Sequence, residues 1–210
     1  MNTILLLVPI GLIGYLLGSI NSAVIVTRIN GRDDIRGKGS GNAGMTNMFR
    51  VYGRHAGLLT ALGDLLKAVL AVLAARAIAG LAISPLPFDA GYAAGLFVII
   101  GHIYPLYFRF RGGKGVLPAL GIILMVRPLA FAVLLAIALP VFLAFRIVSL
   151  VSVLSACLLP PVTLSLCLLQ GRDPVYETGF AAVYAILVLL SHRANIRRLL
   201  QGTEKAITRK

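Results

Sequence analysis

Long apolar stretches make up most of this chain, and short polar segments separate them. An α-helix needs about 20 apolar residues to cross the ~30 Å hydrocarbon core of a bilayer, and the stretches are long enough. The pattern therefore predicts an all-α integral membrane protein in which residues 1–210 form a single domain. We expect helices near residues 3–27, 56–80, 91–108, 116–126, 129–145, 147–169 and 177–191.

Residues 116–145 decide between six and seven membrane crossings. Arg127 and Pro128 interrupt this stretch, because proline breaks a helix and a charge in the bilayer core is costly. Seven spans with the N-terminus outside would put sixteen lysines and arginines on the cytoplasmic side and three on the other, whereas six spans would give ten against eight. Since cytoplasmic loops carry the excess of positive charge, we expect seven transmembrane helices, with the N-terminus outside and the C-terminus cytoplasmic.

Composition and charge narrow the class of protein further. Hydrophobic residues make up 59% of the chain and charged residues 13%, and the mean hydropathy of +0.93 exceeds what a soluble core requires. The formal net charge of +13 suits a protein that is oriented in a membrane and attracts anionic lipid. No basic stretch is interleaved with aromatic residues, so the charge does not indicate nucleic-acid binding.

The first polar segment follows the first apolar stretch and combines glycines with hydrogen-bond donors. Glycines let successive backbone N–H groups turn inward around an anion, and a guanidinium strengthens such a site. A plain glycine-rich turn between two helices is the alternative, but it needs only one or two glycines. The segment contains Gly37, Gly39, Gly41 and Gly44, the polar side chains of Ser40, Asn42, Thr46 and Asn47, and Arg50.

The second polar segment reads Gly112-Gly113-Lys114-Gly115 and leads into a predicted helix. The N-terminus of a helix favours an anion, so this segment predicts a second phosphate site. In the phosphate loop of nucleotide hydrolases, Ser or Thr follows Gly-Lys, whereas Gly115 stands there in this chain. The segment therefore indicates phosphate binding without nucleotide hydrolysis.

A few polar side chains interrupt the apolar stretches or lie at their ends. Asp64 and Lys67 are three residues apart on one helix face, where they form either a packing ion pair or a functional pair. His102 lies near the cytoplasmic end of its helix, and His192 and Asn195 share a three-residue spacing at the end of the last helix. No cluster of His, Cys or carboxylate has the spacing of metal ligands, so we expect no metal.

Three motifs together carry a family resemblance. The first is Ser40-Gly41-Asn42-x-Gly44-x-Thr46-Asn47-x-x-Arg50. The second joins Gly101-His102-x-x-Pro105 to Phe110-x-Gly112-Gly113-Lys114-Gly115-Val116, and the third is His192-Arg193-x-Asn195-Ile196. In order and spacing they resemble the bacterial acyl-phosphate:glycerol-3-phosphate acyltransferases, the PlsY family. Ala43, Met45 and Leu117-Pro118 depart from that family's pattern without removing a charged or nucleophilic group.

The resemblance implies transfer of a fatty acyl group from acyl phosphate to the sn-1 hydroxyl of glycerol 3-phosphate. The products would be lysophosphatidic acid and phosphate, in the first step of phospholipid biosynthesis. It also implies a multi-pass enzyme of the bacterial inner membrane, with its active site at the cytoplasmic face. We expect a monomer that contacts membrane lipid and uses no cofactor.

The loop chemistry and the resemblance together assign roles to residues. Ser40, Lys114, His192 and Asn195 are the predicted catalytic residues. The proton of the attacking hydroxyl goes either to His192 or to a substrate phosphate oxygen; in the second case His192 and Asn195 orient the glycerol hydroxyls. Predicted phosphate-binding residues are Gly39, Gly41, Asn42, Thr46, Asn47, Arg50, Gly112, Gly113, Gly115, Ser149 and Ser152, with support from Asp64, Lys67 and His102.

Two other classes of function remain as alternatives. A transporter of phosphorylated metabolites would place its ionisable residues near the bilayer midplane and show matching broken helices in its two halves, and the sequence shows neither. A lipid-binding structural protein is supported only by the net charge.

Overall fold

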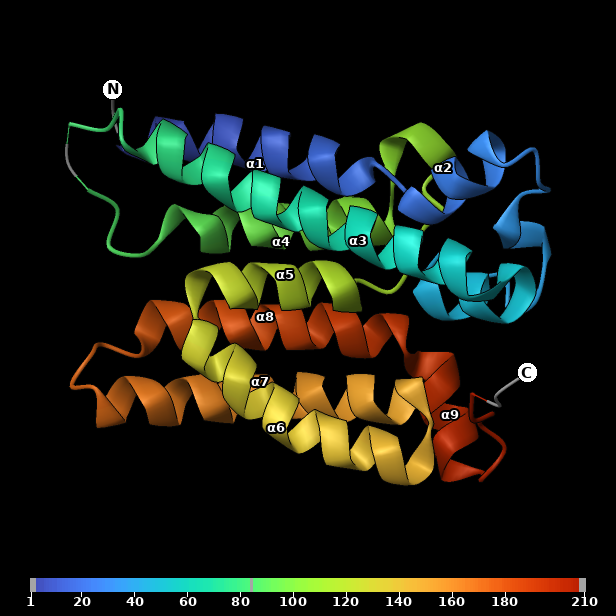
Figure 1. The fold of residues 1–210 in the computed structure, drawn as a ribbon. Coiled ribbons are helices and arrows are strands. Elements are labelled where there is room, and N and C mark those ends of the chain that lie inside the picture. The colour runs from blue at the N-terminus through green and yellow to red at the C-terminus, as the bar shows by residue number, and fades with distance from the viewer. Residues whose placement is uncertain (1–2, 84, 208–210) are drawn as a thin grey trace. The chain divides into compact units, whose positions relative to one another are not determined.

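The computed structural model describes residues 3–83 and 85–207 (Figure 1). The described residues form helices joined by turns, with no strand among them. The chain divides into two compact units, Met1–Val126 and Arg127–Lys210, and each packs its own set of helices.

Unit 1 is built around the long helix α3. Helices α1, α4 and α5 all pack against it, and α1 also lies along α4. A Cβ on Gly14 of α1 would lie 2.7 Å from the carbonyl oxygen of Ala94 on α4, so only glycine permits this close approach. The described elements of unit 1 are α1 (Thr3–Ser19), α2 (Ser22–Ile29), η1 (Ile35–Gly37), α3 (Met45–Ala79), α4 (Ala90–Ile103), η2 (Leu106–Phe108) and α5 (Val116–Val126).

The helix predicted over residues 3–27 is interrupted. Helix α1 ends at Ser19, and α2 restarts at Ser22 with a bend of 41°. The side chain of Asn21 accepts a hydrogen bond from the Val24 N–H at 3.1 Å, a donor that a continuous helix would pair with Ile20. A capping residue inside an apolar stretch therefore ends one helix and begins the next, which hydropathy does not predict.

The helix predicted over residues 56–80 begins eleven residues earlier, at Met45. Gly53 has a φ of +86° inside α3 and marks a kink between its first turns and its long apolar part. Because the turns before this kink are polar, their hydropathy resembles that of a loop. As a result, the first glycine-rich segment leads directly into a helix N-terminus.

Helix α4 also differs from its predicted range of 91–108. It ends at Ile103, and the short turn η2 follows after Pro105. The residue before a proline avoids helical geometry, and Tyr104 has the non-helical angles φ −122° and ψ 68°. This early end of α4 exposes its last carbonyl groups to the second glycine-rich segment.

Unit 2 contains, among its described residues, α6 (Pro128–Phe145), α7 (Val148–Leu169), α8 (Val175–Ser191) and α9 (Arg193–Leu200). Helix α7 packs against both α6 and α8, and α9 turns away from α8 by 69°. Pro128 occupies the first position of α6, where its missing N–H has no cost, in keeping with the break predicted at this point. Helix α9 was not predicted, because it is polar.

A buried ion-pair cluster joins α6, α7 and α8. Arg127 is 6% exposed, and its Nε lies 2.8 Å from Oε2 of Glu177. Its Nη2 donates to Sγ of Cys167 at 3.1 Å, while Arg172 pairs with the other oxygen of Glu177. The sequence placed Arg127 at a helix break and among the three positive charges outside, whereas the structure makes it the buried partner of a carboxylate.

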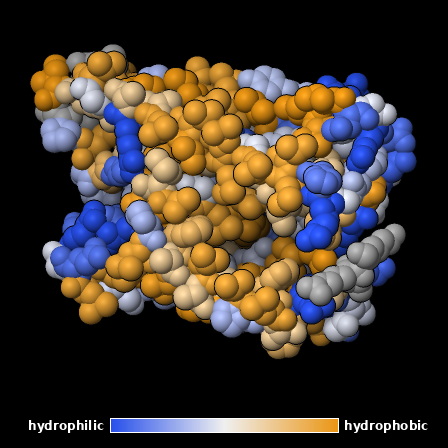
Figure 2. Space-filling view, viewed as in Figure 1, coloured by the Kyte–Doolittle hydropathy of each residue, from blue (hydrophilic) through white to orange (hydrophobic). Residues whose placement is uncertain are grey.

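Four of the described helical segments are long and apolar enough to cross a membrane: Met45–Ala79, Ala90–Phe108, Pro128–Phe145 and Val148–Leu169. The bent pairs α1–α2 and α8–α9 raise this number to six if each pair is one span. Helix α5 has 11 residues, fewer than a perpendicular span needs. Figure 2 shows apolar side chains along the helices and hydrophilic ones nearer their ends.

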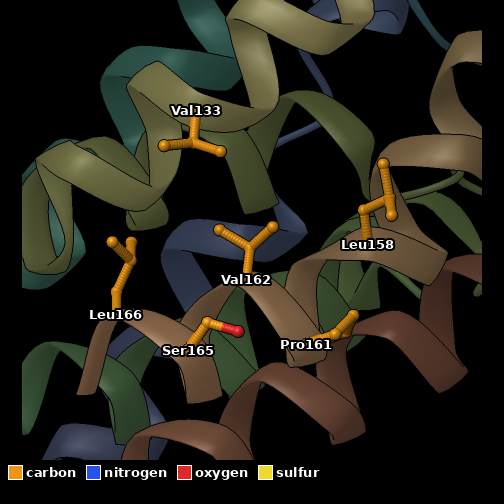
Figure 3. A pocket seen from close by; sticks show the side chains of 6 residues that line it. All are labelled: Val133, Leu158, Pro161, Val162, Ser165 and Leu166. Atoms are coloured by element: carbon orange, nitrogen blue, oxygen red, sulfur yellow. The ribbon is translucent and has the colours of Figure 1, made fainter. Parts of the chain in front are cut away.

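An apolar groove of about 230 Å³ lies between α6 and α7 (Figure 3). Ser165 supplies the one hydroxyl among its lining side chains, and no charged group faces it. Its lining offers phosphate no positive charge, so residues that could bind an anion lie elsewhere in each unit. Its lining residues are Val133, Leu158, Pro161, Val162, Ser165 and Leu166.

Candidate active site

The first glycine-rich segment forms a turn that ends at the N-terminus of α3. Gly39 and Gly41 have φ values of +60° and +73°, which residues with a Cβ rarely adopt. Gly44 is the N-cap of α3 and provides no side-chain cap, so the first-turn amides of α3 have no acceptor within the helix. A glycine turn that opens onto uncapped helix amides is an arrangement that favours phosphate.

Asn47 holds this turn in place from the first turn of α3. Its side-chain oxygen accepts a hydrogen bond from the Ser40 N–H at 3.0 Å. Its side-chain nitrogen donates to the carbonyl oxygens of Lys38 at 2.9 Å and Asn42 at 3.0 Å. The side chain is 1% exposed, so these contacts give Asn47 a role in shaping the loop where sequence reasoning expected a direct phosphate ligand.

The other predicted residues of this segment lie on or beside the turn. Ser40 and Arg50 are exposed, and Asn42 and Thr46 are half-buried. Thr46 and Arg50 are four residues apart on α3, so their side chains lie on the same face of the helix. An apolar cluster that includes Ile35, Ala43, Met48 and Phe108 supports the turn from below.

The second glycine-rich segment runs from the end of α4 to the start of α5. The N–H groups of Gly112 and Gly113 donate to the carbonyl oxygens of Ile103 and His102 at 3.2 and 3.0 Å. These two amides therefore cap the end of α4 and do not form the predicted anion nest. What the segment offers an anion is the half-buried Lys114 side chain and the N-terminus of α5 after Gly115, which has a φ of +81°.

Arg36 joins the two segments, and sequence reasoning missed it. Its Nη1 donates to the carbonyl oxygen of Phe108 at 2.6 Å, while its Nη2 pairs with Oδ2 of Asp34, also at 2.6 Å. The side-chain hydrogen bond from Arg36 lowers the pKa of the Asp34 carboxyl, against the opposing effect of burial. The sequence treated Arg36 only as a cytoplasmic positive charge, although its spacing of two residues from an aspartate was visible.

Below the two segments, unit 1 contains a buried polar cluster. Nζ of Lys67 lies 2.9 Å from Oδ1 of Asp64 and 2.8 Å from Nδ1 of His102. The three-residue spacing of Asp64 and Lys67 thus places them in contact, and the structure adds His102 to the pair.

Unit 2 contains the remaining predicted residues, at the start of α7 and around α9. The Nδ1 of His192 lies 2.8 Å from the carbonyl oxygen of Val188. Because a carbonyl oxygen only accepts, Nδ1 of the neutral ring carries the hydrogen and Nε2 is its acceptor nitrogen. This tautomer suits His192 for receiving a proton or a hydrogen bond from a hydroxyl. Ser152 donates to the carbonyl oxygen of Val148 within α7.

Glu204 connects the elements of unit 2 that carry predicted site residues. Its Oε1 accepts hydrogen bonds from Asn195 at 2.7 Å and from Ser149 at 2.8 Å, and its Oε2 pairs with Arg198. Burial opposes ionisation, but the hydrogen bonds from Arg198, Ser149 and Asn195 lower the pKa of the Glu204 carboxyl. Sequence reasoning assigned Glu204 no role.

We expect Glu204→Gln to lower the thermal midpoint of the protein by about 4–8 °C, which corresponds to the loss of about 2 kcal/mol. A carboxyl with a lowered pKa stabilises the fold above its ordinary pKa of 4.5, and the stabilisation is lost as pH falls through the lowered value. The difference between wild type and variant should therefore be constant between about pH 6 and 8 and shrink in acid. Gln201→Ala, an exposed change at the C-cap of α9, is the control and should leave the midpoint unchanged. Equal midpoints for wild type and Glu204→Gln at neutral pH would contradict this role.

Among the described residues, no group of three or more His, Cys, Asp or Glu side chains could hold a metal ion. The positively charged side chains among the predicted site residues are Arg50 and Lys114 in unit 1, and unit 2 has basic residues on α9.

Apolar helices of membrane-spanning length, together with glycine turns at helix N-termini, are features expected of a membrane protein that binds phosphate. A family model of glycerol-3-phosphate acyltransferases matches residues 8–202. The chain belongs to the glycerol-3-phosphate acyltransferase family.

Similar proteins agree with this membership. The glycerol-3-phosphate acyltransferase of Pseudomonas putida is 41% identical over 197 residues, which are 93% of this chain and 97% of that protein. The glycerol-3-phosphate acyltransferase of Geobacter sulfurreducens is 40% identical over 193 residues, covering 91% and 93% of the two chains. The crystal structure of PlsY (YgiH), an integral membrane glycerol 3-phosphate acyltransferase in its glycerol 3-phosphate form, matches with a TM-score of 0.81 at 32% identity and covers 96% of each chain.

Proposed function

We propose that this chain transfers a fatty acyl group from acyl phosphate to the sn-1 hydroxyl of glycerol 3-phosphate. The carbonyl carbon gains a bond to the hydroxyl oxygen and loses its bond to phosphate, which leaves as inorganic phosphate. The observation that carries the proposal is the pair of glycine segments in unit 1, each leading into a helix N-terminus and joined by Arg36. Two phosphate-bearing substrates repel each other, so adjacent cationic sites are what their encounter requires.

The chemistry of each residue suggests its role in this reaction. The α3 N-terminus, Thr46 and Arg50 would bind one phosphate, and Lys114 with the α5 N-terminus would bind the other and stabilise the charge that develops on the leaving group. Ser40 would donate from the exposed edge of the first turn. His192, through Nε2, would accept the hydroxyl proton or orient the hydroxyl. Glu204 would position Asn195 and Ser149 through the hydrogen bonds that it accepts from them.

The proposal includes a location. We infer one acyltransferase domain with seven spans in the inner membrane of a bacterium, in which α5 is a short span and the glycine segments face the cytoplasm. The excess of positive charge on the loops and tail supports this orientation. The acyl chain would lie among apolar helices, where it needs no passage through water. We expect the chain to act as a monomer.

Reporter fusions test the orientation. Fusions after Arg146 and at the C-terminus should fluoresce with green fluorescent protein and lack alkaline phosphatase activity, because seven spans put both positions inside. A fusion after Asp173 is the matched control and should behave in the opposite way. Phosphatase activity from the C-terminal fusion would contradict the seven-span arrangement.

Acceptor choice tests the function itself. Purified protein given palmitoyl phosphate should acylate glycerol 3-phosphate and leave glycerol untouched, because the acceptor is recognised through its phosphate. Chromatography of labelled products distinguishes the two. Equal acylation of glycerol, or no acylated product, would overturn the proposal.

A further inference from the structure

Lys67 uses every hydrogen-bond donor that it has. Its ammonium nitrogen lies 2.7 Å from the carbonyl oxygen of Ile20, 2.8 Å from Nδ1 of His102 and 2.9 Å from Oδ1 of Asp64. A lysine ammonium has three donors, and here they meet three acceptors, one on α3, one on α4 and one in the break between α1 and α2. The side chains of Asp64, Lys67 and His102 are all at most 4% exposed, so no water competes for these contacts.

The Ile20 contact ties this cluster to the break between α1 and α2. In a continuous helix the Ile20 carbonyl would accept from Val24, but the Val24 N–H donates to Asn21 instead. Lys67 supplies the missing donor. On the other side, Oδ1 of Asp64 also accepts from Oγ of Ser22, the first residue of α2, at 3.0 Å. The cluster therefore pairs with two polar groups at the break, the Ile20 carbonyl and the Ser22 hydroxyl.

The same geometry fixes the proton of His102. A protonated ammonium can only donate, so Nδ1 of His102 must accept and carry no hydrogen. The ring is then neutral, with its hydrogen on Nε2. With Asp64 negative and Lys67 positive, the cluster as a whole has no net charge, which is the least costly state inside apolar surroundings.

The Nε2 side of this ring faces the second glycine-rich segment. A Cβ built on Gly113 would collide with Nε2 of His102 and would lie 3.0 Å from the carbonyl oxygen of Ala43 in the first segment. The Gly113 N–H also donates to the carbonyl oxygen of His102 at 3.0 Å. His102 therefore lies where the end of α4 and both glycine-rich segments meet, and its ring faces Gly113, the residue directly before Lys114.

We propose that Asp64 and Lys67 hold His102 as its neutral Nε2–H tautomer, and that the ring held in this way is a positioning residue for Lys114. The inference rests on the proposed function for the role of Lys114. A simple ion pair between Asp64 and Lys67 would not require His102. Here Lys67 also donates to His102, and the His102 ring faces the loop that carries Lys114.

Nitrogen NMR of the full chain in lipid bilayers, with ¹⁵N-labelled histidine, reads the tautomer directly. The protein has three histidines, so the spectrum of His102→Gln identifies the signals of His102 by their loss. At neutral pH we expect an unprotonated Nδ1 and a protonated Nε2. The double variant Asp64→Asn/Lys67→Met keeps the size of both side chains without a buried lone charge, and it should shift both signals of His102. Thr60→Val, a buried change on α3 whose hydroxyl donates to the carbonyl oxygen of Ala56 at 2.8 Å, is the control and should leave them in place.

Kinetics of the same variants test the positioning role. The double variant should lower kcat by about tenfold to a hundredfold, as expected for a small displacement of a catalytic group, with a smaller change in KM. Thr60→Val should retain wild-type kcat. A protonated Nδ1 in the wild type, or a double variant with unchanged His102 signals or unchanged kcat, would overturn the inference. If the wild type formed no lysophosphatidic acid, the proposed function would fail, while the NMR result would still decide the tautomer.

Discussion

Arg50→Ala and Lys114→Ala should each lower the rate of acyl transfer by about 10²–10³-fold while the protein still folds and inserts. Both side chains would lie beside a substrate phosphate, and a charge that stabilises a developing anion in a partly dry site has an effect of this size on kcat. In the structure Arg50 is exposed and Lys114 is half-buried. The loss should therefore appear in kcat without a fall in the thermal midpoint.

Matched variants separate a local effect from a general loss of positive charge. Arg54→Ala removes an exposed arginine of α3 one turn beyond Arg50 and should retain nearly full activity. Arg50→Lys keeps the charge but not the two-pronged geometry, so it should recover only part of the rate. Near-wild-type rates for Arg50→Ala and Lys114→Ala would refute the assignment of the two loops to phosphate.

Acyl phosphate should support turnover, and acyl-coenzyme A and acyl carrier protein should give no product above background. The sites in unit 1 are small turns at helix N-termini, which suit a donor whose only head group is phosphate. The longest connection between described helices of unit 1, from α2 to α3, is folded back on itself by the contacts of Asn47 with Ser40 and Lys38.

The same assay should be insensitive to a chelator, because under the proposed function Arg50 and Lys114 would supply the positive charge that a divalent ion would otherwise provide. Lysophosphatidic acid would be measured with each donor, with and without the chelator. Equal rates from acyl-coenzyme A, or loss of activity on chelation, would show that the phosphate sites are assigned incorrectly.

The sequence predicted the polar segments better than it predicted their internal contacts. Glycines at a left-handed φ and a lysine before a helix follow from local chemistry, so Gly39, Gly41 and Lys114 could be singled out from the chain alone. The role of Asn47 could not be distinguished from that of Ser40 or Thr46. In a sequence, a polar residue that binds phosphate looks the same as one that hydrogen-bonds to its own loop. Only the fold shows that its amide contacts Lys38 and Asn42.

The predicted helix boundaries were wrong where a helical segment is polar or where a capping residue lies in an apolar stretch. The start of α3 at Met45 and the whole of α9 are polar, so hydropathy described them as loops. The break at Asn21 was not predicted for the opposite reason, because a single capping side chain lies inside an apolar stretch. These departures matter for function, since they create the α3 N-terminus and position Asn195.

Scarce acidic residues were an unused signal. The chain has 7 Asp and Glu against 20 Lys and Arg, and in the structure the pairs include Asp34 with Arg36, Asp64 with Lys67, and Glu204 with Arg198. In a strongly basic membrane protein, an isolated carboxylate marks a structural contact more reliably than an isolated arginine marks a site. Reading the chain this way would have pointed to Glu204.

The most direct test of the central claim uses sealed proteoliposomes that contain the purified protein, with labelled glycerol 3-phosphate and palmitoyl phosphate supplied on the outside. Lysophosphatidic acid and inorganic phosphate are measured together, along with label in the vesicle lumen. An acyltransferase produces one lysophosphatidic acid for each phosphate released and moves no unmodified glycerol 3-phosphate inward. Labelled glycerol 3-phosphate that accumulates unchanged in the lumen, with no lysophosphatidic acid formed, would contradict the account.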